Sequence, residues 1–577
     1  MRICRSTTTI ALLAGLLATA GAASAAQPPS AARRIPAGVA WVMLIDEPGQ
    51  TATAAGQLLA RFKDLVPDMD PARVGEKLEA QLGENPLTPK GMRALGLDPD
   101  GSLALYSSTF GGEPVLALPL VDAQRFLTKR AAMEQPAAEP DAPPQPAPEL
   151  APAEQRSGAA VYRFSGYDYA IKGNWCLLVP PAGLLPKGAD PIRGFFGKGA
   201  KLARDKSFRH SLAGLPDDSR VAVYLSVTAL RQRWQAYMQR RMAADQRRLE
   251  SAKTPETKQF QRQMLAGARR LAESTDGWLA QFQGLALGMR LTGEQVEGVL
   301  FAATQPRGHQ QLTQVLPAGA APPGFHAGLL ESSILGGWAA FRLPAFLDWI
   351  GPLPASPWTD IDRAIEESTA SFAEHFGMDL RRDVLGNLRE PVLGYLLLPD
   401  LEQLETEAPM EQQIVSLLRL LVITRVADRA KAERFLAAVD ARAAKEGQAI
   451  ETRRVAGAEL HTVQPKPGMA ISWGLKGDVL LFAFGPGAAA SAAQRIDPGA
   501  FRLAAGSQQR GAARFDFSKL GQVLTKAVQR GIGGDQGTRF RMTWPLVQQV
   551  FARLGQWRVS GSLSAQGLTV RSSLGLN

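Results

Sequence analysis

The first half of the chain contains Leu95-Gly96-Leu97-Asp98, followed by Glu113-Pro114-Val115-Leu116-Ala117-Leu118. The second half contains a related series, Phe376-Gly377-Met378-Asp379 followed by Glu390-Pro391-Val392-Leu393-Gly394-Tyr395. In both halves a helical stretch with an Arg-Phe-Leu triplet comes next, at 125–127 and at 434–436. One such pair could arise by chance, but several pairs in the same order are typical of an internal repeat.

The repeated order continues to the end of each half. The further pairs are, in chain order, 162–164 with 453–455, 172–178 with 476–481, 207–209 with 500–502, and a closing β-hairpin at 284–302 with one at 556–573. Turn residues at Thr292-Gly293 and Ala565-Gln566-Gly567 predict the two hairpins. We therefore predict two homologous domains, 33–308 and 322–577, joined by a linker at 309–321.

Short strands and intervening helices indicate the fold class. Val221–Leu225 alternates like a strand, and the stretch 427–445 has Phe435, Leu436 and Val439 on one helical face. Strands are grouped, with helices between the groups, rather than in strict βαβ alternation. This order predicts α+β domains, each an antiparallel β-sheet, flat or curved, with helices packed on one face.

Two insertions distinguish the first domain. A proline-rich loop at 136–152 has seven prolines in seventeen residues and cannot build a core. A basic helical hairpin at 231–271, broken at Lys253-Thr254-Pro255, has eleven Lys or Arg against three Asp or Glu over 231–270. It is a candidate contact for anionic lipid or polymer, and a solvated hairpin inside the domain is the alternative. The candidate contact residues are Arg231, Arg233, Arg240, Arg241, Arg247, Arg248, Lys258, Arg262, Arg269 and Arg270.

The N-terminus predicts export. Residues 1–26 combine Arg2 and Arg5, an apolar core and a small-residue cleavage site, which is the pattern of a signal peptide. We therefore expect a periplasmic or secreted protein, with no transmembrane segment in the mature chain and peripheral membrane contact possible in principle. The formal net charge of +11 then points to lipid headgroups, envelope polymers or acidic proteins, and not to nucleic acid. The oligomeric state stays open.

Motifs for catalysis or metal binding are missing from the sequence. The chain has no Gly-x-Ser-x-Gly elbow and no His-Glu-x-x-His, and its five histidines never fall at i, i+2 or i, i+4. The stretch Asp98–Ser102 resembles the start of a calcium loop, but its twelfth position is Thr109 rather than Glu. Cys176 lies in an apolar strand, where a cysteine is normally inert. We therefore predict no catalytic residue, no metal ligand and no cofactor.

The duplicated order of segments behind a signal peptide resembles an uncharacterised family of exported bacterial proteins, classed as a domain of unknown function. This resemblance implies no catalytic residues, and many members have a membrane anchor that this chain lacks. We expect a non-enzymatic envelope protein that binds an apolar ligand such as a lipid, or another envelope component. Apolar strands such as Val392–Leu398 and Val479–Phe484 favour an apolar site on a sheet. The alternative is a hydrolase whose catalytic residues are dispersed along the sequence.

Overall fold

The chain divides into two compact units. Unit 1 comprises Met1–Ala236 and Phe282–Gln305, and unit 2 comprises Tyr237–Gln281 and Pro306–Asn577. The computed structural model describes residues 29–64, 70–134, 150–292, 294–318, 324–351, 353, 361–399, 401, 413, 417–466, 468–500, 508–530 and 537–577. The predicted signal peptide at 1–26 and most of the predicted proline-rich loop at 136–152 lie outside these residues.

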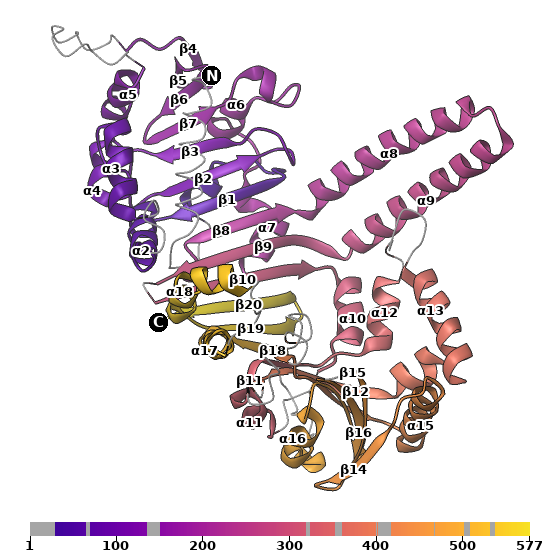
Figure 1. The fold of residues 1–577 in the computed structure, drawn as a ribbon. Coiled ribbons are helices and arrows are strands. Elements are labelled where there is room, and N and C mark those ends of the chain that lie inside the picture. The colour runs from indigo at the N-terminus through magenta and orange to yellow at the C-terminus, as the bar shows by residue number, and fades with distance from the viewer. Residues whose placement is uncertain are drawn as a thin grey trace. The chain divides into compact units, whose positions relative to one another are not determined.

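Unit 1 contains an antiparallel sheet (Figure 1). Its described strands are β1 (Trp41–Asp46), β2 (Ser102–Ser107), β3 (Val115–Pro119), β4 (Glu154–Arg156), β5 (Ala159–Phe164), β6 (Tyr167–Lys172), β7 (Trp175–Val179), β8 (Val221–Ser226), β9 (Phe282–Leu291) and β10 (Gln295–Thr304). They pair in the order β4-β5-β6-β7-β3-β2-β1-β8-β9-β10. The predicted closing hairpin is confirmed, because β9 and β10 are antiparallel partners.

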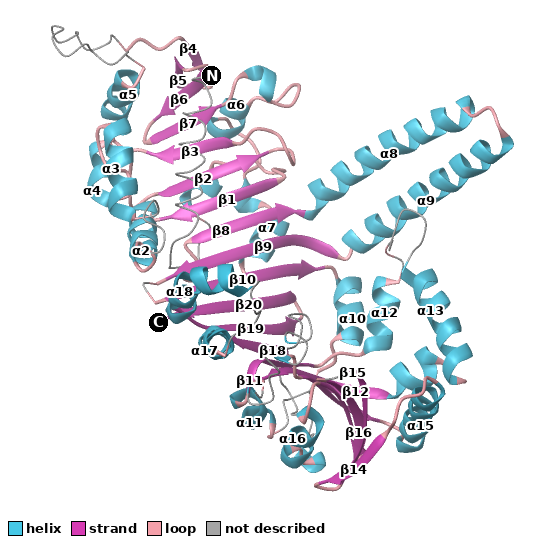
Figure 2. Ribbon diagram, in the orientation of Figure 1, coloured by secondary structure: helices cyan, strands magenta, loops and turns pink. Residues whose placement is uncertain are grey.

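Helices cover both faces of the unit 1 sheet, so the prediction of helices on one face is wrong for this unit (Figure 2). One face packs on η1 (Ser30–Arg33), α6 (Pro191–Phe196), η4 (Leu202–Arg204) and α7 (Lys206–Leu212). The other packs on α2 (Pro48–Ala60), α4 (Pro89–Ala94) and α5 (Ala123–Ala132), with α3 (Pro71–Leu82) against α2. The neighbouring residues Leu44 and Ile45 point to opposite faces and are both buried. Each such leucine or isoleucine contributes about 1.5–3 kcal/mol by leaving water.

Unit 2 also contains an antiparallel sheet. Its described strands are β11 (Ser333–Ala339), β12 (Leu388–Leu397), β13 (Leu420–Val426), β14 (Glu451–Val455), β15 (Ala458–Lys466), β16 (Met469–Lys476), β17 (Val479–Phe484), β18 (Gln509–Asp516), β19 (Leu554–Ser564) and β20 (Gly567–Leu576). They pair in the order β14-β15-β16-β17-β13-β12-β11-β18-β19-β20. Strand by strand, this is the order of the unit 1 sheet.

Helices reach both faces of the unit 2 sheet as well. One face packs on α11 (His326–Glu331) and α16 (Ala488–Arg495), and the other packs on α15 (Arg429–Lys445). The helix predicted at 427–445 is therefore confirmed, and Asp428 caps it by accepting from the backbone N–H of Lys431. The other described helices between residues 306 and 577 are α10 (Pro306–Val315), α12 (Leu343–Ile350), α13 (Ile361–Phe376), η5 (Leu380–Val384), η6 (Leu385–Asn387), η8 (Pro498–Ala500), α17 (Phe517–Gln529) and α18 (Gly537–Arg553).

Strand order also tests the predicted segment pairs. Glu390–Tyr395 lies in β12, which holds the sheet position of β2, whereas 113–118 leads into β3. Similarly, 453–455 lies in β14, at the position of β4 rather than β5. These two pairs are displaced by one strand. The turns after β6 and β16, by contrast, coincide, and Gly173 and Gly477 there both have positive φ, at 60° and 63°.

The basic insertion forms two helices of 25 residues, α8 (Val227–Ser251) and α9 (Pro255–Leu279). The predicted break is confirmed: Thr254 accepts a hydrogen bond from the N–H of Thr257, and Pro255 occupies the first turn of α9. The predicted linker at 309–321 differs from the structure, because residues 309–315 belong to α10. α10 packs on α12 within unit 2.

Candidate functional site

One face of the unit 2 sheet carries a continuous row of apolar side chains. The row joins directly opposed residues on eight strands, and directly opposed residues share a face. Its members, from β20 to β16, are Leu574, Trp557, Phe515, Leu335, Leu396, Leu420, Phe484 and Ile471. We call these eight residues the apolar row.

The apolar row is in contact with solvent along its length. None of its members is buried, and Leu335, Leu420 and Trp557 are 38%, 44% and 42% exposed. Val422, two residues along β13 on the same face, is 45% exposed and lies opposite Gly394, which has no side chain to cover it. Isolated exposed apolar residues are normal, but contiguous apolar surface usually marks a binding site.

Among the described residues, helices contact this face on either side of β11, β12 and β13. On one side Phe435 of α15 lies 6.1 Å from Phe482 between ring centroids. On the other side Phe517 of α17 lies 4.6 Å from Phe515 and 6.3 Å from Phe551 of α18. The exposed members on β11 and β13 lie between these two helical contacts in the strand order.

The corresponding face of unit 1 is covered over β1, β2 and β3, whereas Leu287 of β9 and Leu300 of β10 on the same face are 36% and 44% exposed. On the covered strands Ile45, Leu103 and Leu116 are buried against Ala52 of α2 and Met92 of α4, helices that follow the first strand of the unit. In unit 2 the helices that follow the first strand pack mainly on other helices: α12 on α10, and α13 on α15. This difference in helix packing leaves Leu335 of β11 and Leu420 of β13 exposed in unit 2, whereas the corresponding strands β1 and β3 of unit 1 lie in a filled core.

The sequence indicated this face only in part. Val392–Leu398 and Val479–Phe484, which favoured an apolar site, lie in or next to β12 and β17, on either side of β13. Leu335, Leu420 and Trp557 were not singled out. The sequence at 420–423 is uniformly apolar, so it carries no signal that Leu420 and Val422 are exposed while Leu421 and Ile423 are buried.

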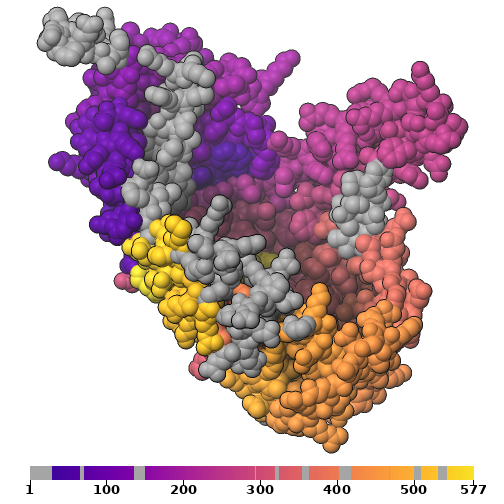
Figure 3. Space-filling model, viewed as in Figure 1, coloured from indigo at the N-terminus to yellow at the C-terminus, as the bar shows by residue number. Residues whose placement is uncertain are grey.

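The ten predicted contact residues of the basic hairpin lie on α8 and α9, and eight of them are exposed, with Arg231 and Arg241 half-buried. The hairpin forms the magenta group of atoms in the space-filling view (Figure 3). Asp245 is buried, with its carboxylate 3.1 Å from Arg248 and 3.9 Å from Arg241. Among the described residues, Arg247, Arg262 and Arg269 have no carboxylate partner. Arg262 and Arg269 are seven residues apart and therefore share a face of α9.

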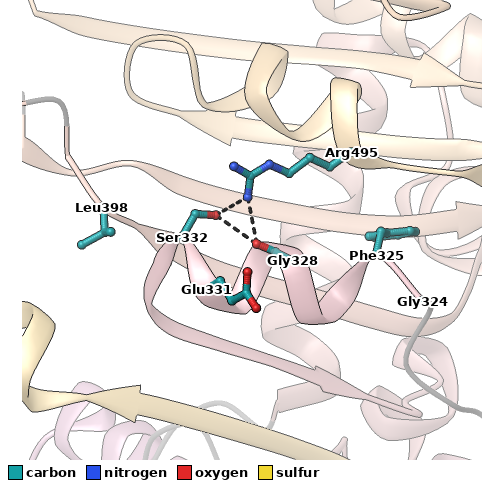
Figure 4. Close-up of a pocket in the computed structure, with 7 residues that line it drawn as sticks. All are labelled: Gly324, Phe325, Gly328, Glu331, Ser332, Leu398 and Arg495. Atoms are coloured by element: carbon teal, nitrogen blue, oxygen red, sulfur yellow. Dashed lines mark hydrogen bonds between the residues drawn. The ribbon is translucent and has the colours of Figure 1, made fainter.

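A second feature of unit 2 is a pocket of about 670 Å³ beside the end of α11 (Figure 4). The Arg495 guanidinium lines it but donates to the Gly328 carbonyl at 2.8 Å and to Ser332 Oγ at 2.6 Å. Arg514 and Lys519 also donate to carbonyl groups at this helix end. These cations satisfy the last carbonyls of α11, which is a structural role.

Two histidines have defined side-chain partners. His461 Nδ1 lies 3.0 Å from Asp440 Oδ2, and its ring stacks on Trp473, whose Nε1 donates to Asp440 at 2.9 Å. The second ring nitrogen faces Glu459 Oε1 at 3.7 Å. His326 Nδ1 lies 2.6 Å from the hydroxyl of Tyr395. The polar partners of these two histidines are therefore carboxylates and a tyrosine hydroxyl.

The buried His326 has a consequence for acid stability. Burial, and then the charge of Arg514, lowers the pKa of His326 from 6.5 to about 4. The unfolded chain therefore takes up this proton first as the pH falls below about 6.5, and stability falls until the pH reaches the folded pKa. We expect unit 2 to lose about 2 kcal/mol from this group between pH 7 and pH 5.

Urea unfolding at the two pH values measures this loss. His326→Gln keeps a polar partner for Tyr395 but does not titrate, so its unfolding midpoint is expected to change less between pH 7 and pH 5. Equal changes in the wild type and the variant would show that His326 does not control acid stability.

No protein family model, curated protein or solved structure matches the chain.

Within the described residues no group of three or more His, Cys, Asp or Glu side chains could hold a metal ion. None of the described helices is long and apolar enough to span a membrane. Cys176 is fully buried in β7, and burial raises the pKa of its thiol.

Proposed function

We propose that this chain is a non-enzymatic exported protein that binds the acyl chain of a lipid along the apolar row of unit 2. The observation that carries the proposal is the continuity of the apolar row across eight strands with Leu335, Leu420 and Val422 exposed. An acyl chain has no polar groups to satisfy along its length, so it needs apolar area rather than precise hydrogen bonds.

The energy available from such a contact is sufficient for binding. Each methylene group that leaves water contributes about 0.8 kcal/mol, so ten buried methylenes would supply about 8 kcal/mol before the cost of association. The aromatic members of the apolar row, Trp557, Phe515 and Phe484, add large contact area with few rotatable bonds. Trp557 Nε1 already donates to Ser572 Oγ at 2.7 Å, so a ligand need not satisfy it.

Two further parts of the proposal concern origin and location. We propose that the units arose by duplication, which the shared strand order and the matching turns at Gly173 and Gly477 support. In that case only unit 2 has kept this face exposed at the strands β11 and β13, whose counterparts β1 and β3 are covered in unit 1. Export rests on the sequence pattern at 1–26, and membership of an uncharacterised exported bacterial family stays a prediction.

Native mass spectrometry of the protein purified from a periplasm, before and after organic extraction, tests the acyl-chain proposal. The expected result is an adduct of lipid mass that extraction removes. A bare protein mass in both spectra, together with no uptake of a fluorescent fatty acid by the extracted protein, would contradict it.

We propose that the basic hairpin binds an anionic membrane surface, from which the protein takes up its lipid. Replacing Arg247, Arg262 and Arg269 with Gln is expected to weaken binding to phosphatidylglycerol–phosphatidylcholine vesicles roughly a hundredfold, since each basic residue near such a surface contributes about 1 kcal/mol. Co-sedimentation at low and high salt measures the effect, and salt should weaken the wild type more than the variant.

A control for this experiment is the replacement of Arg73, Arg204 and Arg209 with Gln, because these three arginines are exposed in unit 1. It removes the same charge from another surface. Equal loss of vesicle binding in the two triple variants would show that net charge, rather than the hairpin, attracts the vesicle.

A further inference from the structure

A pocket of about 460 Å³ lies in unit 1, and none of its lining residues belongs to the apolar row or to the basic hairpin. Its lining combines cationic and aromatic side chains. Arg33 and Arg34 come from η1 and the residue after it, Lys201 precedes η4, and Trp175 and Phe196 form an aromatic wall. One carboxylate, that of Asp98, also lines the pocket.

The two half-buried cations are held in place by their surroundings. The Arg34 guanidinium lies 5.6 Å from the centre of the Trp175 ring, and it has no carboxylate partner among the described residues. Lys201 Nζ donates to the carbonyls of Gly194 and Phe195 at 2.7 and 3.0 Å, at the end of α6. These contacts fix both groups before any ligand arrives, which lowers the entropic cost of binding.

The charges in the pocket do not balance. The half-buried Arg34 and Lys201 lie in the same lining, and the carboxylate among the lining residues, that of Asp98, already accepts a hydrogen bond from the N–H of Asp100 at 3.0 Å. Burial and the nearby Arg34 lower the pKa of Lys201, which is the sign of a cation near a like charge. A bound anion would relieve this repulsion between Arg34 and Lys201.

We propose that this pocket binds a phosphate group, held by Arg34 and Lys201 against the Trp175 wall. Guanidinium and ammonium groups are the usual phosphate partners, and a guanidinium can donate two parallel hydrogen bonds to one phosphate. The phosphate could be free or could belong to a lipid headgroup. The inference concerns unit 1 only and does not depend on acyl-chain binding in unit 2.

Isothermal titration of the full chain with inorganic phosphate, and separately with glycerol 3-phosphate, tests the proposal at constant ionic strength. Arg34→Gln is expected to weaken binding at least about tenfold, because it removes a charge-assisted hydrogen bond. Asp98→Asn keeps an oxygen for the Asp100 N–H but removes the opposing charge, so it is expected to tighten binding roughly threefold or more. Arg204→Gln, an exposed arginine outside the pocket lining, is the matched control.

Two outcomes would support the proposal and identify the source of the phosphate. Tighter binding of glycerol 3-phosphate than of inorganic phosphate would indicate a headgroup, and equal binding would indicate free phosphate. The proposal would be overturned if neither compound bound the wild type, or if Arg34→Gln and Arg204→Gln had equal effects. A circular dichroism spectrum of each variant establishes that it is folded.

Discussion

The double variant Leu420→Asp, Val422→Asp is expected to purify without lipid and to take up no fluorescent fatty acid. Both side chains lie on β13, on the sheet face that carries the apolar row, and they are 44% and 45% exposed. Two carboxylates there would have to lose water against an acyl chain, and the cost of burying an unpaired charge exceeds what the remaining apolar contacts supply. Native mass spectrometry and a displacement assay measure the loss, which we expect to be complete.

Because both residues are exposed, the double variant should fold with nearly unchanged stability. Val121→Asp is the control, since Val121 is 53% exposed, belongs to unit 1 and is not a member of the apolar row. It should keep the lipid. If Val121→Asp lost the lipid equally, or if the double variant kept it, the apolar row would not be the binding surface.

Leu481→Ala is expected to destabilise unit 2 by about 3–4 kcal/mol. Leu481 is fully buried in β17, opposite Ile423, on the face that packs against the alanines of α16. The truncation leaves a cavity that the rigid sheet cannot close, and cavity formation adds to the lost transfer energy. We expect a fall of roughly 6–10 °C in the melting temperature, measured by calorimetry.

Leu420→Ala is the matched control for this stability experiment. It makes the same chemical change on the neighbouring strand β13 but on the exposed face, so it should cost less than about 1 kcal/mol. It should nevertheless weaken fatty-acid binding, whereas folded Leu481→Ala should bind normally at low temperature. Equal loss of stability in the two variants would show that the apolar row is part of a packed core.

Much of the local structure could be predicted from the sequence. The helix break at Thr254-Pro255, the helix after Asp428 and the closing hairpins were recognisable because caps, prolines and turn residues act on their immediate neighbours. The inert position of Cys176 followed from the apolar strand around it. The prediction that helices pack on only one face of each sheet was wrong. Val42–Ile45 and Trp175–Val179 are continuous apolar runs, the pattern of strands buried on both faces, and helices indeed cover both faces there.

The strand order, and with it the candidate site, was decided by the tertiary structure. The segment pair 113–118 and 390–395 looked equivalent because both are apolar stretches after Glu-Pro, yet they occupy different positions in their sheets. The apolar row takes one residue from each of eight strands. These residues are spread along the chain from Leu335 to Leu574, and helices and loops separate them in the sequence. The sequence by itself therefore determined the strands, the turns and the basic hairpin, which depend on contacts between near neighbours. Only the register of distant strands, and the packing of α12 and α13 on other helices, determined which apolar side chains stay exposed together.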